Sequence, residues 1–513
     1  MKKHDTKTND YSVPPDGRLT FAMASAVSHM RIATMIMVAG IAITSYAMSF
    51  EVAVWRGETF VALMPDFVEI ENASEGIAVR YGVLQPVRYA PVPGSLQRVY
   101  GMDRVEWGIT SGGPRVVEIS VAPETKPGVY ECGMMRIRVI NRVLPPAKEW
   151  RYHLDLWQHP WAVARYFGVR PFSKEHYAAM RPVYETLATA GQKTLTTTIL
   201  PEPWAHQCRD RYDTMVVRIK KADGSWSFDY SIFDEYVEFG RSCGLGPDIA
   251  CYSICPWGCV LRWNDESGKE HSLVAPPDSP FFEEYWGAFL VDFAAHLKRK
   301  GWFSDVYLAM DERSVEEVKA TVELIRKFAP GIKVSMAGNI VPSAYGTAID
   351  NYSVLLGEGI DAEFIAEAKK RRMQGMKTTF YVCCGPRQPN TFLCSGLGEA
   401  FWLGAYPSMC GLDGFLRWAW NSWPEDPVID ASYCSWMAGD TFLVYPDGSP
   451  SWRFMDMRNG IVAAEKIRML KEQGVFVDEI NVLAGKYNSA EASSGKSDYV
   501  GIRTETLNLV NRD

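Results

Sequence analysis

Two adjacent carboxylates, Asp311 and Glu312, are the residues of this chain best suited to chemistry. They follow the hydrophobic run 306–310 and precede a segment with helical periodicity. Burying such a pair is costly, because each group loses hydration and adjacent negative charges raise one another's pKa. Pairs of this kind are typical of acid–base sites, where one carboxyl group stays protonated beside a charged one. The structural alternative is that Asp311 caps the next helix and Glu312 lies in its first turn.

Eight predicted strands, most of them separated by helical patterns, surround this pair in the sequence. We expect the strands at residues 152–156, 193–199, 248–254, 305–310, 333–337, 351–355, 377–382 and 414–420. Only the short stretch 342–347 joins the fifth strand to the sixth. Eight strands alternating with helices over about 270 residues predict an α/β (β/α)₈ TIM barrel. A last helix at 457–473 would complete the outer ring, and the tail after Lys486 is expected to be loosely held.

The region before the barrel has the short alternating runs of an all-β domain, separated by Gly and Pro clusters. Several strands at this spacing predict an N-terminal β-sandwich. The sequence therefore predicts a multidomain protein. It has a signal peptide or N-terminal extension at 1–47, a β-sandwich at 48–147, the catalytic barrel at 148–475 and a C-terminal extension at 476–513.

The N-terminus resembles a secretory signal peptide with a long front. An apolar run at 32–43 follows Arg31, and Ser45 and Ala47 suit a cleavage site. If translation started at Met30, the signal peptide would have the short charged N-terminal region of an ordinary signal peptide. We expect export to the periplasm or medium, a mature start near Met48 and no stable membrane span.

Composition and charge exclude some classes of binding partner. The 513 residues carry a net charge of -7 and no basic stripe, which argues against nucleic acid. The 11 Cys include Cys251, Cys255 and Cys259 at four-residue intervals, but no paired zinc spacing, so we expect no metal and no cofactor. Oligomeric state and disulfide pairing stay open.

The strand ends carry side chains typical of a sugar site, because barrel active sites form at the carboxyl ends of the strands. Aromatic faces stack on sugar rings, while amides and carboxylates bind hydroxyl groups. The predicted substrate-binding residues are His159, Trp204, Trp257, Asn339, Tyr381, Trp418, Trp420 and Asn421. We therefore expect a glycan or glycoconjugate as the partner.

Several other residues at or beyond the strand ends have structural interpretations. Adjacent Cys383 and Cys384 are interpreted as packing residues and Asp440 as a turn former. Arg453 and Glu465 are interpreted as an ion pair.

Five segments together resemble glycoside hydrolase family 123. They are DLWQHP at 155–160, AMDER at 309–313, CGP with PNTF at 384–386 and 389–392, LRWAWNSW at 416–423 and AGDTFLVYP at 438–446. The likeness spans roughly residues 150–470. The resemblance implies a β-N-acetylgalactosaminidase type of enzyme with a β-sandwich followed by a (β/α)₈ barrel. It also implies a substrate-assisted retaining mechanism, with the family's Asp-Glu pair at Asp311 and Glu312.

The implied reaction is the exo-acting removal of a β-linked 2-acetamido sugar, with GalNAc favoured. The acetamide oxygen of the sugar attacks C1 and forms an oxazolinium ion, so no enzyme carboxylate bonds to carbon. Asp311 would orient the acetamide, and Glu312 would be the general acid and base. A turn must let them converge, because neighbours in a regular strand point to opposite faces. The Asp311 charge would also help to keep Glu312 protonated near neutral pH.

Two alternatives remain open at this stage. One is a catalytically inactive carbohydrate-binding protein, which would keep the same sugar site. The other is a retaining glycosidase with an enzyme nucleophile such as Glu358 or Glu399. The choice between GalNAc and GlcNAc depends on one hydroxyl group, and no residue in the sequence identifies it.

Overall fold

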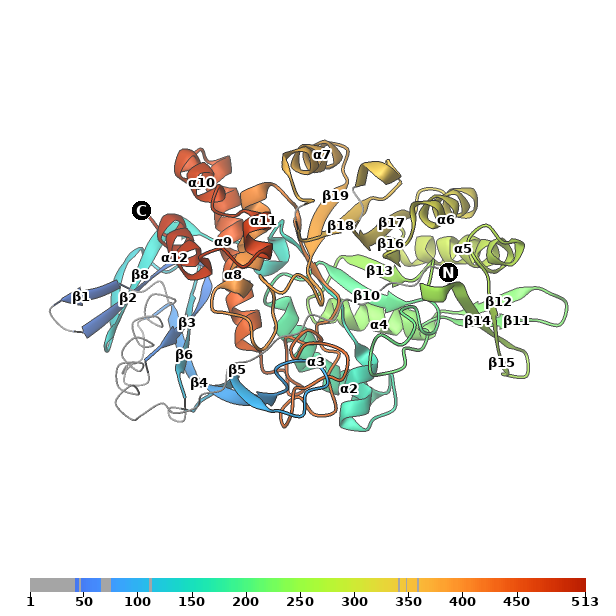
Figure 1. Cartoon of the computed structure of the whole chain (residues 1–513), viewed down its shortest axis with the longest axis horizontal. Helices are drawn as coiled ribbons and strands as arrows, with labels where there is room; N and C mark the ends of the chain where they lie inside the picture. Colours follow the sequence, from blue (N-terminus) through green and yellow to red (C-terminus); the bar gives the residue numbers. More distant parts are fainter. Residues whose placement is uncertain are drawn as a thin grey trace, which may run out of the picture.

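The computed structural model describes residues 42–45, 48–65, 75–109, 113–339, 342–346, 348–357 and 359–513. Most of the predicted signal peptide and Glu358 lie outside these residues. The N-terminal strands form one end of the molecule, the last helices lie in the middle, and the barrel occupies the other end (Figure 1).

The N-terminal region is all-β in its described part, with two four-stranded sheets. The first has the order β1-β2-β8-β7 and the second β3-β6-β4-β5. Their strands are β1 (Ala42–Ser45), β2 (Met48–Arg56), β3 (Thr59–Met64), β4 (Ile77–Tyr89), β5 (Val99–Trp107), β6 (Arg115–Val121), β7 (Gly128–Cys132) and β8 (Met135–Val143). Strands β2 and β8 pair in parallel, whereas the other neighbours are antiparallel.

The predicted barrel strands are all present in one eight-stranded parallel sheet. They are β9 (His153–Leu156), β10 (Thr194–Thr198), β13 (Asp248–Tyr252), β16 (Val306–Asp311), β17 (Lys333–Gly338), β18 (Asn351–Leu355), β19 (Lys377–Tyr381) and β20 (Gly414–Arg417). The order is β10-β13-β16-β17-β18-β19-β20-β9. The ends β9 and β10 meet through a parallel bridge between Leu154 and Gln192, so the sheet fits a TIM barrel.

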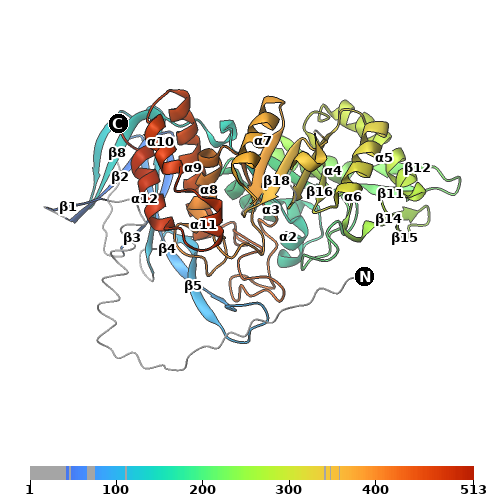
Figure 2. The same ribbon diagram turned by 45° about the horizontal axis from the view of Figure 1, so that its top comes forward.

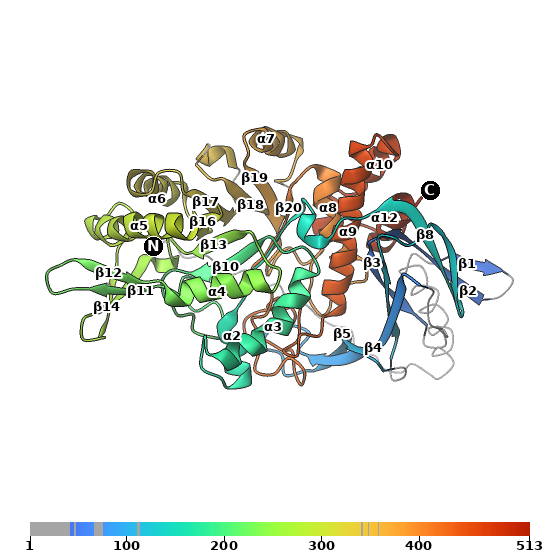
Figure 3. The ribbon, with the colours of Figure 1, turned by 180° about the vertical axis from the view of Figure 1, so that it is seen from behind.

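Helices cover the outside of this sheet (Figure 3). They are α2 (Pro160–Phe167), α3 (Lys174–Ala188), α4 (Ser231–Ser242), α5 (Pro280–Lys300), α6 (Val315–Phe328), α7 (Ala362–Met373), α8 (Glu399–Cys410) and α9 (Trp452–Glu472). The short crossover is confirmed, because only the 3₁₀ turn η3 (Pro342–Tyr345) is described between β17 and β18. The 3₁₀ turn η1 (Ala147–Glu149) leads into the barrel.

A small side sheet was not predicted. Strands β11 (Val217–Lys220) and β12 (Trp226–Asp229) follow β10, and β14 (Val260–Asp265) and β15 (Glu270–Val274) follow β13. They form a sheet of order β12-β11-β14-β15 that projects from the barrel (Figure 1). These strands are short and largely accessible, so their sequences lack the apolar runs that identify the barrel strands.

The expectation of a loosely held tail is wrong. Helices α10 (Val477–Ala484), α11 (Ser489–Ser493) and α12 (Tyr499–Val510) lie beside α8 and α9 (Figure 2). Asn488 and Asp498 cap α11 and α12 with their side chains. The carbonyl of Val510 accepts a 2.9 Å hydrogen bond from the Trp55 indole, which ties the tail to the N-terminal sheets.

Helix α9 begins five residues earlier than predicted and joins the barrel to the N-terminal region. The Asn459 amide exchanges two hydrogen bonds with the backbone of Val61, and Lys466 Nζ lies 2.6 Å from Glu58 Oε2. The predicted ion pair between Arg453 and Glu465 is wrong, because other partners are nearer. Arg453 pairs with Asp103 at 2.8 Å, and Glu465 pairs with Arg468 at 2.7 Å. In the described part of the chain, every helix is too short or too polar to cross a bilayer.

Candidate active site

A cavity of about 180 Å³ lies at the carboxyl ends of the barrel strands and contains both predicted acids. Its lining consists of Trp157, Gln207, Trp257, Asp311, Glu312, Ala337, Tyr381, Cys383, Cys384, Leu416, Trp418 and Trp436. The capping interpretation of Asp311 does not hold, because Ser314 caps helix α6 and forms a capping box with Glu317. The acids are therefore free to face the cavity.

Backbone geometry at Glu312 explains how neighbouring side chains share one cavity. Glu312 has a φ of 46°, in the left-handed region that residues with a Cβ rarely adopt. Its N–H donates to the Ala337 carbonyl at 2.9 Å, which anchors the end of β16 to β17. The strand alternation stops at Asp311, as the expected turn required. Such local strain is typical of functional sites.

The pKa of Asp311 differs from the expectation that this carboxyl group is charged beside Glu312. Burial first, and then the neighbouring charge of Glu312, raise the pKa of Asp311 to about 7, while Arg313 opposes the rise. Asp311 therefore keeps its proton to a higher pH than an ordinary aspartic acid, whereas the sequence interpretation had it charged. An N–H donor from a ligand would favour its ionised form.

Tyr381, at the end of β19, holds the second acid in place. Its hydroxyl donates a 2.8 Å hydrogen bond to Glu312 Oε1. Burial and the Glu312 charge raise the pKa of Tyr381, so the phenol keeps its proton and remains a donor. Tyr381 also lines the cavity beside the two acids.

Indole rings form much of the remaining wall. The Nε1 atoms of Trp157 and Trp257 are buried, and each indole N–H lies close enough to a carboxyl group, that of Asp155 and of Asp311 respectively, to lower the pKa of that group. These contacts favour the ionised form of each carboxyl group and partly offset the effect of burial on its pKa. Trp257 lies on the 3₁₀ turn η2 (Trp257–Cys259), with the Arg313 guanidinium 5.2 Å from its ring centre.

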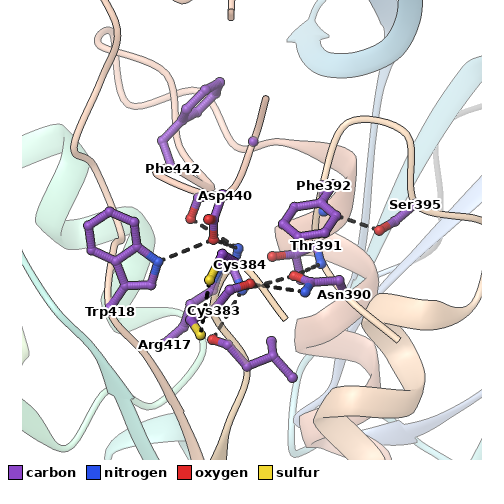
Figure 4. A network of polar contacts seen from close by, with 12 residues as sticks. Cys383, Cys384, Asn390, Thr391, Phe392, Ser395, Arg417, Trp418, Asp440 and Phe442 are labelled. Atoms are coloured by element: carbon purple, nitrogen blue, oxygen red, sulfur yellow. Dashed lines mark hydrogen bonds and ion pairs between the residues drawn. The ribbon is translucent and has the colours of Figure 1, made fainter. Parts of the chain in front are cut away.

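A buried ion pair positions Trp418 (Figure 4). Arg417 Nη2 lies 2.8 Å from Asp440 Oδ1, and both side chains are fully buried. The same carboxylate oxygen accepts a 3.1 Å hydrogen bond from Trp418 Nε1. Arg417 also donates to Asn390 Oδ1 at 3.1 Å. Asp440 does lie in a turn, but its carboxylate has the further role of orienting an indole of the cavity wall.

Five of the predicted binding residues do not line this cavity. The His159 Nε2–H donates to the Trp418 carbonyl, and burial lowers the pKa of His159 to about 4, so the ring is neutral. Asn421 exchanges hydrogen bonds with the His159 backbone. Trp204 stacks behind Trp157 at 5.4 Å. The other two are Trp420, which is buried and donates to Val183, and Asn339, which is exposed beyond β17.

Other lining residues were missed or interpreted differently. Gln207 and Trp436 lie far along the loops after β10 and β20, where the Trp436 indole donates to the Gln207 carbonyl at 3.1 Å. Cys383 and Cys384 were visible at a strand end but were interpreted as packing. Cys384 is exposed to the cavity, and a hydrogen bond from Cys383 lowers its pKa to about 7.

Of the two alternative nucleophiles, Glu358 lies outside the described residues. Glu399 is buried at the start of α8, away from the cavity lining. Its carboxylate accepts hydrogen bonds from the backbone N–H groups of Asn390 and Gly396 and from Gln388. Glu399 is therefore a structural acceptor, and its candidacy as a nucleophile is wrong.

Known proteins resemble this chain both in sequence and in structure. Residues 157–470 match the family model described as "Glycoside hydrolase 123, catalytic domain". A family 123 glycoside hydrolase from Clostridium perfringens, studied for glycolipid glycan hydrolysis, superposes with a TM-score of 0.78 at 24% identity. The match covers 90% of this chain and 92% of that one, and so shows a shared fold.

A GH10 xylanase with a bacterial Ig-like domain, from termite gut, is more distant, with a TM-score of 0.36 and 10% identity. That match covers 82% of this chain and 100% of that one. A search of curated proteins found no significant match.

Proposed function

The chain belongs to glycoside hydrolase family 123, and from this premise we propose that it removes β-linked 2-acetamido sugars by substrate-assisted catalysis. The observation that carries the proposal is the convergence of Asp311 and Glu312 on one cavity. Among the described residues of the lining, no other carboxylate is present. A single adjacent pair suits a reaction in which the substrate supplies its own nucleophile.

In this mechanism Asp311 binds the acetamide N–H, and its ionised form balances the positive charge that develops as the oxazolinium ring closes. Glu312 protonates the leaving oxygen and then takes a proton from water, which opens the ring with net retention. Tyr381 keeps Glu312 Oε1 hydrogen-bonded, so the other oxygen of that carboxyl group is the one available for proton transfer.

The cavity supports exo-action on a terminal sugar. Its volume of about 180 Å³ is below the roughly 300–1,000 Å³ of pockets for larger ligands, so it suits one sugar unit. The wall of Trp157, Trp257, Trp418 and Trp436 offers faces for stacking. We favour GalNAc, and we propose the glycans of glycolipids as natural substrates, by analogy with the Clostridium perfringens enzyme.

A panel of aryl β-glycosides of GalNAc, GlcNAc, galactose and glucose tests the reaction class. The proposal expects hydrolysis of the two 2-acetamido substrates alone, because galactose and glucose lack the internal nucleophile. Equal turnover of the 2-hydroxy sugars would overturn substrate assistance.

Two inhibitors separate the proposal from a mechanism with an enzyme nucleophile. A thiazoline analogue of the oxazoline should compete with substrate. A 2-fluoro sugar should leave no covalent adduct on the protein, as measured by intact mass. A labelled Glu358 would establish the alternative instead.

We also propose that the protein is exported and that its two N-terminal sheets pack as a β-sandwich. The signal-like run at 32–43 supports export, and the buried residues that both sheets contribute to one core support the sandwich. Cleavage near Met48 would remove β1. N-terminal sequencing of protein secreted by an expression host tests this site.

A further inference from the structure

Three metal-binding side chains converge beside the cavity without lining it. They are Cys255, Cys259 and Glu317, and their ligand atoms all lie within 4.8 Å of one another. Both thiols are buried, whereas the Glu317 side chain is 32% exposed and gives the cluster a route to solvent. Cys259 Sγ lies 3.8 Å from Glu317 Oε1.

The fold brings these groups together through a tight turn. Gly258 and Cys259 have φ angles of 70° and 52°, so the chain curls back and both thiols face the same point. Left-handed backbone at a residue with a Cβ is costly, and it often marks a functional constraint. The third group comes from the first turn of α6. One oxygen of Glu317 accepts the Ser314 N–H in the capping box, which leaves Oε1 directed at Cys259.

The observed separations suit a tetrahedral ion. Zinc binds thiolate sulfur at about 2.3 Å and carboxylate oxygen at about 2.0–2.2 Å. At a tetrahedral angle these lengths place sulfur and oxygen about 3.6 Å apart, close to the observed 3.8 Å. Only a small adjustment of the side chains is therefore needed.

The charge balance of the cluster also favours a divalent zinc ion. Two thiolates and a carboxylate carry three negative charges, and a divalent ion leaves one. Arg313 Nη1 lies 4.0 Å from Glu317 Oε1 and supplies the balancing positive charge. Soft thiolate ligands select zinc over calcium or magnesium, which prefer oxygen.

We propose that Cys255, Cys259 and Glu317 bind one Zn²⁺ ion, with water as the fourth ligand. Binding releases the protons of the two thiols to solvent. The ion would be structural, because it joins the turn that carries Trp257 to helix α6. That turn forms the wall beside Asp311, whose carbonyl accepts a hydrogen bond from Arg313 at 3.0 Å.

Titration with Co²⁺ tests the site directly. Reduced full-length protein, stripped with a chelator, should bind one Co²⁺ per chain and show thiolate-to-cobalt charge-transfer absorption that Zn²⁺ abolishes. Cys255→Ser and Cys259→Ser should lose this band. Glu317→Gln, at a partly exposed position, should weaken binding more than about tenfold, because even changes in groups around metal ligands cost about 10- to 100-fold.

Cys243→Ser is the matched control, since Cys243 is also a buried free thiol but lies outside the cluster. It should keep the band and the rise in melting temperature that Zn²⁺ produces in the wild type. Circular dichroism identifies any cysteine variant that fails to fold. In that case, the affinity of Glu317→Gln for Co²⁺ tests the proposal. Absence of the band in the reduced wild type would overturn the proposal, as would equal loss in Cys243→Ser.

Discussion

Helix α9 and the barrel mouth both gather ionisable side chains, and the two regions differ in how those charges are neutralised. Along α9, each buried charge meets an opposite one. Lys466 and Glu58 lie 2.6 Å apart and are each 1% exposed, and Arg503 and Asp456 lie 2.9 Å apart. Removing one partner of such a pair leaves an uncompensated charge, so these contacts are structural.

At the mouth, two like charges are adjacent instead. Among the described residues lining the cavity, none is Lys or Arg. The backbone at Glu312 is strained, and the pKa of Asp311 is raised by burial and by its neighbour's charge. Unfavourable features of this kind persist where a ligand relieves them or chemistry needs them. Oppositely charged buried pairs therefore stabilise the fold along α9, while two adjacent like charges in a cavity that is open to ligand identify the site.

The largest effect is expected from Glu312→Gln. Loss of the general acid should reduce the hydrolysis of a substrate with a poor leaving group by about a hundred- to ten-thousandfold. An activated aryl glycoside should lose much less, because its leaving group needs little protonation. Glu316→Gln, an exposed neighbour outside the cavity, serves as control. Equal losses on both substrates would contradict the acid role.

Lys466→Met tests whether the buried ion pairs along α9 stabilise the fold. Glu58 would be left buried without its cation, so the free energy of unfolding should fall by about 3–5 kcal/mol. Lys486→Met removes the exposed pair with Glu505 and should cost no more than about 1 kcal/mol. Denaturant titration measures both. A smaller loss in Lys466→Met than in the control would contradict the interpretation of α9.

Asp311→Asn should lower kcat by about a hundred- to a thousandfold, as expected for the loss of a preorganised electrostatic group. In the wild type, the pKa of Asp311 near 7 should give kcat/KM an acid limb near pH 7, because only the ionised form balances the oxazolinium charge. The limb should be absent from the residual activity of the variant. An unchanged limb would assign the titration to another group.

The stability of Asp311→Asn relative to the wild type should depend on pH. The pKa of Asp311 rises from 3.8 to about 7, so between these values the folded protein holds a proton that the unfolded chain has released. Wild-type stability from this group therefore falls as pH rises from about 4 to about 7. Relative to wild type, Asp311→Asn should gain stability across that window and stay constant above it. A melting temperature far below wild type at pH 7 would make the pair structural.

Tyr381→Phe should have the smallest effect. It removes the hydroxyl that donates to Glu312 Oε1, and hydrogen bonds to charged groups contribute about 1.5–3 kcal/mol, so kcat/KM should fall at least about tenfold. Tyr487→Phe is the control, because its buried hydroxyl bonds to Thr506 far from the cavity lining. Full activity of Tyr381→Phe would show that Glu312 needs no such support.

The eight barrel strands, and the position of Asp311 and Glu312 at the end of one of them, could be predicted from the sequence alone. Strand β18 even matches its predicted bounds. This was possible because apolar periodicity and capping residues are local properties, and parallel strands leave few architectures to consider.

Which side chains share the cavity could not be read from the sequence and follows from tertiary packing. His159 and Asn421 lie at strand ends, yet the Asn421 side chain is bonded to the His159 backbone outside the cavity lining. Trp436, in contrast, reaches the cavity from a distant loop. The left-handed turn at Glu312 and the approach of Glu317 to Cys259 likewise join residues that no local pattern connects. The physical reason is that convergence depends on how loops pack across the barrel mouth, which is set by contacts between residues far apart in the chain.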